Sequence, residues 1–196
     1  SATIANIIDD AKHNQKKSIC FVTGVPGAGK TLAGLNIANQ RHNIDQGEHA
    51  VFLSGNGPLV DVLQEALARN EVAEKKGTYD ALTKAQSLTK TKAFIQNIHH
   101  FRDDALQTEK PPIEHVAVFD EAQRAWTAAK ATSFMAAKKG ITNFNMSEPA
   151  FLISTLDRHP DWATIVCLIG GGQEINTGEA GLTEWFNAIE KRFPHW

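Results

Sequence analysis

The segment GVPGAGKT, residues 24–31, is the clearest candidate for chemistry in this sequence. It fits the pattern Gly-x-x-x-x-Gly-Lys-Ser/Thr at every fixed position and lies between a predicted strand and a predicted helix. In such a loop the backbone N–H groups point at phosphate oxygens, and the positive end of the following helix faces the same anion. We therefore expect ATP to bind here, with Lys30 at the β- and γ-phosphates and the Thr31 hydroxyl on Mg²⁺. The expected nucleotide-binding residues are Gly24, Val25, Pro26, Gly27, Ala28, Gly29, Lys30 and Thr31.

Two adjacent carboxylates supply the second half of a possible site. The stretch HVAVFDEAQRAW, residues 115–126, is an apolar strand pattern that ends at Asp120 and Glu121. Beside a phosphate loop, a carboxylate at a strand end can hold Mg²⁺, and the next carboxylate can activate a water molecule. An Asp-Glu pair after a strand is by itself more often a solvated loop, but the complete phosphate loop upstream favours catalysis. We expect Asp120 to bind the metal and Glu121 to be the general base, with Lys30 as a further catalytic residue.

The tetrad Asp-Glu-Ala-Gln at 120–123 is similar to the Asp-Glu-x-Gln signature of superfamily one helicases. Together with FLSGNGPLVDVL, FDEAQRAW and LIGGGQEI, it makes residues 18–190 resemble the first RecA-like domain of the bacterial Schlafen-like helicases. The resemblance implies that Gln123 and Arg124 couple the magnesium site to neighbouring elements, with Gln123 among the nucleotide-binding residues. It also implies that Ser54, Gly55 and Asn56 contact the backbone of single-stranded DNA or RNA, although a turn that caps a helix explains the same letters equally well.

A second glycine-rich turn, LIGGGQEIN at 168–176, lacks the Lys-Ser/Thr pair of a phosphate loop. The resemblance implies that its strand lies between the strand of the phosphate loop and the strand of the Asp-Glu pair. Gln173 would then be a catalytic and nucleotide-binding residue that bonds the γ-phosphate or the attacking water. The helicase pattern is Gly-Asp-x-x-Gln, whereas Gly170 and Gln173 are three residues apart and no Asp follows that glycine. The same placement puts Cys20 and Cys167 on neighbouring strands as packed thiols.

The elements that must position these residues follow from hydrophobic patterns. Four apolar runs rich in β-branched residues predict strands at 18–23, 50–54, 115–119 and 164–169. Their continuous hydrophobicity is typical of parallel strands that are buried on both faces. Helical patterns at 30–40, 58–70, 148–156 and 179–192 alternate with them or follow them. These patterns predict a doubly wound α/β fold with a parallel sheet and helices on both faces. The resemblance implies that this fold is a RecA-like P-loop NTPase.

Length and composition bound the remaining possibilities. A chain of 196 residues favours one domain over 1–196, with a peripheral insertion at about 71–112 that contains a helix over 92–106. The formal net charge of −2 gives no global basic field, so nucleic-acid binding requires a local groove. The eight histidines lack the paired spacing of metal ligands. No apolar run approaches the ~20 residues of a membrane span, and the first residues do not resemble a signal peptide, so we expect a cytoplasmic protein without membrane contact.

The leading hypothesis is an ATP-binding and ATP-hydrolysing motor domain of a DNA or RNA helicase. A complete motor closes its site with a second RecA-like domain, for which this chain has no room; that domain's arginine contributes roughly 10³–10⁵ in rate in related enzymes. We therefore expect slow hydrolysis and no unwinding by this chain alone. Two alternatives stay open: a P-loop kinase, and a nucleotide-dependent interaction switch that does not unwind.

Overall fold

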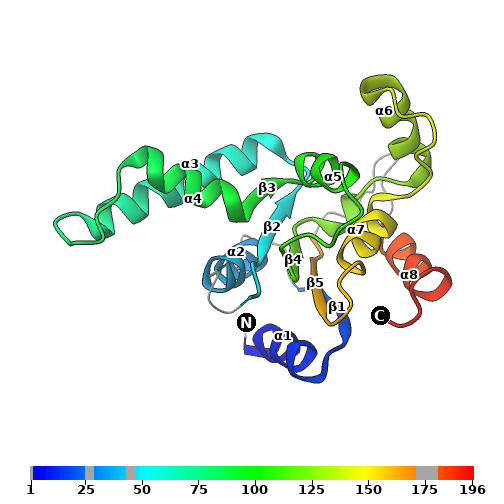
Figure 1. Ribbon diagram of the computed structural model, residues 1–196, viewed down its shortest axis with the longest axis horizontal. Helices are drawn as coiled ribbons and strands as arrows, with labels where there is room; N and C mark the ends of the chain where they lie inside the picture. The colour runs from blue at the N-terminus through cyan, green and yellow to red at the C-terminus, as the bar shows by residue number, and fades with distance from the viewer. Residues whose placement is uncertain (1, 25–28, 43–46, 171–180) are drawn as a thin grey trace.

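A five-stranded parallel sheet forms the centre of the protein, whose computed structural model describes residues 2–24, 29–42, 47–170 and 181–196 (Figure 1). The strands are β1 (Lys17–Val22), β2 (Val51–Ser54), β3 (Ile95–Asn97), β4 (Val116–Phe119) and β5 (Ala163–Leu168). Their order in the sheet is β1-β5-β4-β2-β3, and all four pairs are parallel. The carboxyl ends of all five strands therefore lie at one edge of the sheet, where the predicted site residues follow β1, β2, β4 and β5.

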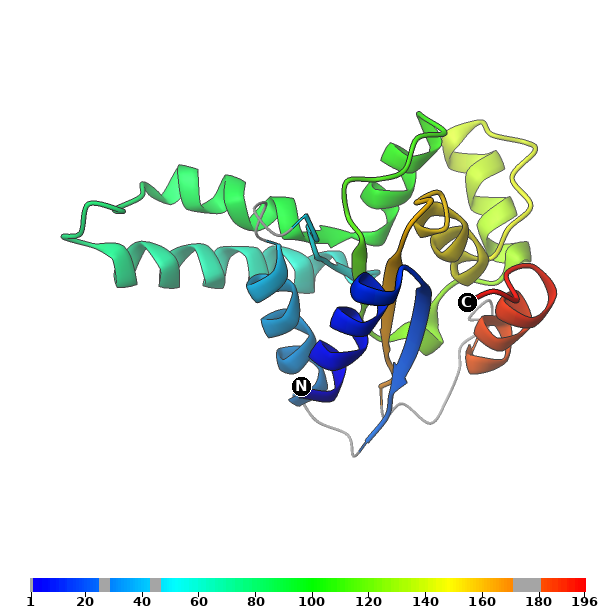
Figure 2. The same ribbon diagram turned by 60° about the horizontal axis from the view of Figure 1, so that its bottom comes forward.

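Helices cover both faces of the sheet, as predicted. The described helices are α1 (Ala2–Asn14), α2 (Gly29–Arg41), α3 (Gly57–Lys75), α4 (Lys84–Phe94), α5 (Ile98–Leu106), α6 (Ala128–Lys139), α7 (Glu148–Leu156) and α8 (Gly181–Lys191), with a short 3₁₀ turn, η2 (Ala122–Arg124). One core joins α1 and α2 to one face, and the other joins α5, α7 and α8 to the opposite face (Figure 2). Along each strand, successive apolar side chains alternate between the two cores, which explains the continuous hydrophobicity of the sequence. Among the described helices, none combines the length and apolar content that a bilayer crossing requires.

The position of β5 confirms the expected strand order. β5 lies between β1 and β4, with Cys20 opposite Val166 and Cys167 opposite Phe21. Both cysteines are free thiols, and burial raises the pKa of Cys20 to about 11 and that of Cys167 well above its usual value. The two thiols belong to cores on opposite faces of the sheet, which makes them packing groups, as the sequence predicted.

The helix predicted over 92–106 is wrong, because the structure breaks it into three elements. α4 ends at Phe94, β3 pairs with β2 through Phe52 and Ile95, and α5 begins at Ile98. The Asn97 side chain caps α5 by accepting from the His99 N–H at 2.9 Å. A buried edge pairing and an N-cap together override the local helical pattern.

Helices α3 and α4 form an arm that projects from the sheet (Figure 1). A capping box fixes the start of α4, in which the Thr83 hydroxyl accepts from Gln86 N–H and the Gln86 side chain accepts from Thr83 N–H. Residues 71–112, the predicted insertion, contribute the distal part of this arm, and they also supply β3 and α5.

Candidate functional site

The predicted phosphate loop joins the end of β1 to the start of α2. Gly24 and Gly29 are its described ends, whereas the predicted nucleotide-binding residues Val25, Pro26, Gly27 and Ala28 lie outside the described residues. Lys30 stands in the first turn of α2, and its Nζ donates to the Gly24 carbonyl at 3.3 Å. The lysine ammonium thus lies between Gly24, shortly after β1, and the amino end of α2.

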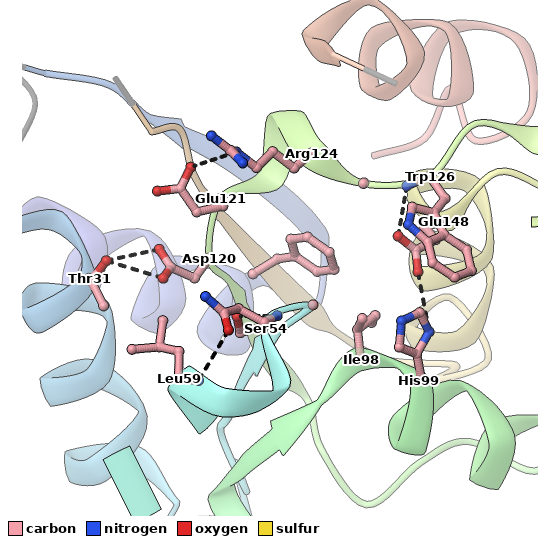
Figure 3. A pocket seen from close by; sticks show the side chains of 14 residues that line it. Thr31, Ser54, Leu59, Ile98, His99, Asp120, Glu121, Arg124, Trp126 and Glu148 are labelled. Carbon is pink, nitrogen blue, oxygen red and sulfur yellow. Dashed lines mark hydrogen bonds and ion pairs between the residues drawn. The ribbon is translucent and has the colours of Figure 1, made fainter. Parts of the chain in front are cut away.

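Thr31 and Asp120 meet at the centre of the site. The Thr31 Oγ1 lies 3.1 Å from each carboxylate oxygen of Asp120, which follows the last residue of β4 (Figure 3). The Asp120 N–H donates to the Leu53 carbonyl at 2.9 Å and continues the sheet pairing by one residue. Asp120 is only 4% exposed, and this desolvation raises its pKa, against the lowering effect of the Thr31 hydroxyl.

This hydroxyl and carboxylate are the hard oxygen ligands that Mg²⁺ prefers. A buried carboxylate whose only hydrogen-bonded side-chain partner among the described residues is a neutral hydroxyl is electrostatically unfavourable, and a divalent cation would relieve that cost. The two residues predicted from the sequence as metal ligands therefore fit the ion.

Glu121 leaves the strand in an unusual backbone conformation. Its φ and ψ are 50° and 49°, the left-handed region, and its side chain is 44% exposed. Oε2 accepts from Gln123 Nε2 at 2.6 Å and lies 3.7 Å from the Arg124 Nε. In turn, Gln123 Oε1 accepts from the Gly170 N–H at 2.9 Å, just beyond the end of β5. Gln123 thus contacts the predicted base and the neighbouring strand.

A cavity of about 490 Å³ opens beside these residues (Figure 3). It is lined by Thr31, Ser54, Gly55, Asn56, Leu59, Ile98, His99, Phe119, Asp120, Glu121, Arg124, Ala125, Trp126 and Glu148. The predicted nucleic-acid residues are Ser54, the last residue of β2, and Gly55 and Asn56, which lead from β2 into α3; together they form the turn at 54–56. Asn56 donates its N–H to Ser54 Oγ at 3.1 Å, and its own Oδ1 caps α3 by accepting from Leu59 N–H at 3.1 Å. The structure therefore brings two predicted groups, metal and base on one side and nucleic-acid residues on the other, to one cavity.

The far wall of the cavity was not predicted from the sequence. Trp126 N–H donates to Glu148 Oε1 at 2.7 Å, and Glu148 N–H donates to the Trp126 carbonyl at 2.9 Å. Arg102 is 2% exposed and lies 3.7 Å from Glu148 Oε2, while His99 packs its ring 4.6 Å from that of Trp126. Burial, reinforced by the Arg102 charge, lowers the pKa of His99 to about 4. No spacing of residues in the sequence predicts this cluster, because its members come from three separate segments of the chain.

The predicted catalytic residue Gln173 lies outside the described residues. The last described position before it is Gly170, whose backbone approaches Glu121 closely. A Cβ atom built on Gly170 would overlap Oε2 of Glu121 and lie 2.6 Å from its Cδ. The first glycine of the second turn therefore permits the approach of a carboxylate to the backbone.

A group of potential metal ligands also lies at the opposite edge of the sheet, where β4 and β5 begin. His115, His159 and Asp161 bring one ligand atom each within 4.8 Å of one another. The two imidazole rings are stacked with centroids 3.7 Å apart, so their in-plane lone pairs do not converge on one ion. Each ring also bonds to a backbone carbonyl, His115 to that of Trp162 and His159 to that of Glu114. We interpret this group as structural.

Comparisons of the sequence and the structure with known proteins identify similar helicase domains. The family model "Schlafen group 3, DNA/RNA helicase domain" matches residues 17–196. Among solved structures, the helicase domain of Hef from Pyrococcus furiosus is similar with a TM-score of 0.46 and 18% sequence identity. That similarity covers 95% of this chain and 35% of the Hef chain, so this chain spans about a third of that structure. No curated protein matches the sequence.

Proposed function

The chain belongs to the Schlafen group 3 DNA/RNA helicase domain family, and we propose that it is the ATP-binding and ATP-hydrolysing part of a helicase motor. The observation that carries the proposal is the pairing of Thr31 with the buried Asp120, beside Glu121, at the carboxyl ends of the central strands. Residues 1–196 would form one RecA-like domain. A second RecA-like domain in the full-length protein would close the site.

Nucleotide binding would begin with the phosphate loop. Its backbone N–H groups and Lys30 would hold the phosphates, because the loop precedes the amino end of α2. Thr31 and Asp120 would hold Mg²⁺ with the phosphate oxygens. When bound, the ion neutralises charge that builds up on the β- and γ-phosphates.

Hydrolysis would use water as the nucleophile. A water molecule attacks the γ-phosphorus in line, its oxygen–phosphorus bond forms, and the bond from that phosphorus to the β–γ bridging oxygen breaks. Glu121 orients this water and accepts its proton, and the products are ADP and inorganic phosphate. Lys30 stabilises the charge on the transferred group. Gln173 would sense the γ-phosphate from the segment after β5.

Single-stranded DNA or RNA would lie against the turn at 54–56. Ser54 lines the cavity but is only 2% exposed, and its Oγ already accepts from Asn56 N–H, so the main contact would come from Asn56 at the amino end of α3, where N–H groups favour an anion. The turn shares its cavity with Asp120 and Glu121, so nucleic acid and ATP would bind within reach of each other.

Phosphate release in the presence and absence of nucleic acid tests this proposal. We expect Mg²⁺-dependent release of phosphate from ATP without any acceptor molecule, whereas a kinase transfers the γ-phosphate chiefly to an acceptor. We further expect a change in rate when single-stranded DNA or RNA is added, with binding that weakens as salt increases. An ATPase rate that no nucleic acid alters would instead favour an interaction switch.

A further inference from the structure

A short chain of contacts joins the end of β5 to the carboxylate of Glu121. The Gly170 N–H donates to Gln123 Oε1 at 2.9 Å, and Gln123 Nε2 donates to Glu121 Oε2 at 2.6 Å. Gln123 is only 6% exposed, and both ends of its amide are engaged. A buried amide that is bonded at both ends has one favourable orientation, so it transmits the position of one partner to the other.

Gly170 approaches the same carboxylate through its backbone. The described glycines with left-handed φ angles are Gly47, Gly77, Gly140 and Gly181, so backbone conformation does not demand glycine at position 170. The lack of space demands glycine, because a Cβ atom at position 170 would overlap Glu121 Oε2 and lie 2.7 Å from Glu121 Oε1. This neighbour is the carboxylate end of the Glu121 side chain. A methyl group at position 170 would therefore rotate the carboxylate away rather than unfold the protein.

We propose that Gly170 and Gln123 are positioning residues for Glu121, an inference that rests on the proposed ATPase function. The donors that contact this carboxylate in the described part of the chain, Gln123 and Arg124, both lie at Oε2. Oε1 is therefore the oxygen that accepts the proton of the attacking water. Gln123 fixes the rotation of the carboxylate, and the missing side chain at Gly170 leaves it room to adopt that rotation.

The decisive variant is Gly170→Ala, measured for both nucleotide binding and turnover. A displacement of about 1 Å in a catalytic group can cost about 10²-fold in rate, so we expect kcat to fall by about that factor. The affinity for a fluorescent ATP analogue should stay at the parent value, because Lys30, Thr31 and Asp120 are unchanged. In the Glu121→Gln background, where the base is already lost, Gly170→Ala should have no further effect on single-turnover hydrolysis.

Gln123→Met, with Gln64→Met as its matched control, keeps the inference testable if the alanine variant folds poorly. Gln64 is similarly buried, at 8% exposure, and donates to the Ile95 carbonyl at 2.7 Å, away from the cavity. Removal of either amide should cost stability, but only Gln123→Met should lower kcat, and this loss should disappear in the Glu121→Gln background.

The possible outcomes separate this inference from the proposed function. An active parent chain whose Gly170→Ala variant keeps the parent turnover overturns the inference alone. So does an equal loss of rate in the parent and Glu121→Gln backgrounds, since a general structural defect would act in both. A parent chain that binds ATP with Mg²⁺ and never releases phosphate contradicts the proposed function itself.

Discussion

Gly34→Ala tests how tightly the helix of the phosphate loop packs on the sheet. Gly34 lies inside α2, where an added Cβ would stand 2.5 Å from Leu168 Cδ1 and 2.9 Å from Val118 Cγ1. Both neighbours are at most 1% exposed, so neither has space to move away. Overpacking of a core costs roughly 1–3 kcal/mol, and two such contacts indicate the upper half of that range.

The gain in helix propensity opposes this cost. Exchange of glycine for alanine inside a helix stabilises by about 1 kcal/mol, which leaves a net destabilisation of about 1–2 kcal/mol. For a chain of this length the change corresponds to a drop of about 2–8 °C in Tm, measurable by differential scanning calorimetry. The neighbouring Ala33→Gly variant isolates the propensity and should itself lower Tm. A Gly34→Ala variant with a higher Tm than the parent would show that α2 does not approach the sheet as closely as described.

Three further predictions concern the buried Trp185 and two residues that line the cavity, His99 and Asn56. Trp185 Nε1 donates to the Ala122 carbonyl at 2.8 Å, and Ala125 N–H donates to the same oxygen at 3.2 Å, so Trp185→Phe removes one of two hydrogen bonds and should destabilise by about 0.5–1.5 kcal/mol in urea unfolding; unchanged stability would contradict a contribution from the indole bond. Burial lowers the pKa of His99 from 6.5 to about 4, so the neutral ring contributes stability that is fully present above pH 6.5 and is lost as the pH falls toward 4. His99→Phe should reduce the dependence of Tm on pH between 4 and 6.5. An unchanged slope of Tm against pH would contradict the assignment. Asn56→Ala removes the cap that accepts from Leu59 N–H, which should cost about 1 kcal/mol of stability and weaken binding of a fluorescent single-stranded oligonucleotide; retained affinity would refute the role of the turn.

The sequence predicted the parts of the fold that depend on local pattern. The four predicted strands correspond to β1, β2, β4 and β5 within one residue at each end. Short, continuous apolar runs rich in β-branched residues are typical of strands that are buried on both faces. The helix predicted over 148–156 was also found at those residues, as α7. The placement of β5 between its neighbours was confirmed, although it came from the family resemblance rather than from the residues themselves.

The missed features depend on contacts between distant parts of the chain. β3 has only three residues and is a strand because it pairs with β2, so no local sequence pattern predicts it. The contact of Gly170 with Gln123 and Glu121 joins two segments 47 residues apart, and only the fold shows that this glycine leaves room for a carboxylate. The Trp126–Glu148 pair was missed for the same reason.

Phosphate release and nucleotide binding, measured together on Lys30→Ala, Glu121→Gln and the parent chain, test the central claim most directly. We expect the parent to release phosphate from ATP slowly and only with Mg²⁺. Lys30→Ala should lose nucleotide binding, because the ammonium that stabilises the phosphates is gone. Glu121→Gln should bind the nucleotide as the parent does and release almost no phosphate. If Glu121→Gln hydrolysed ATP at the parent rate, Glu121 would not be the base, and the proposed mechanism would be wrong.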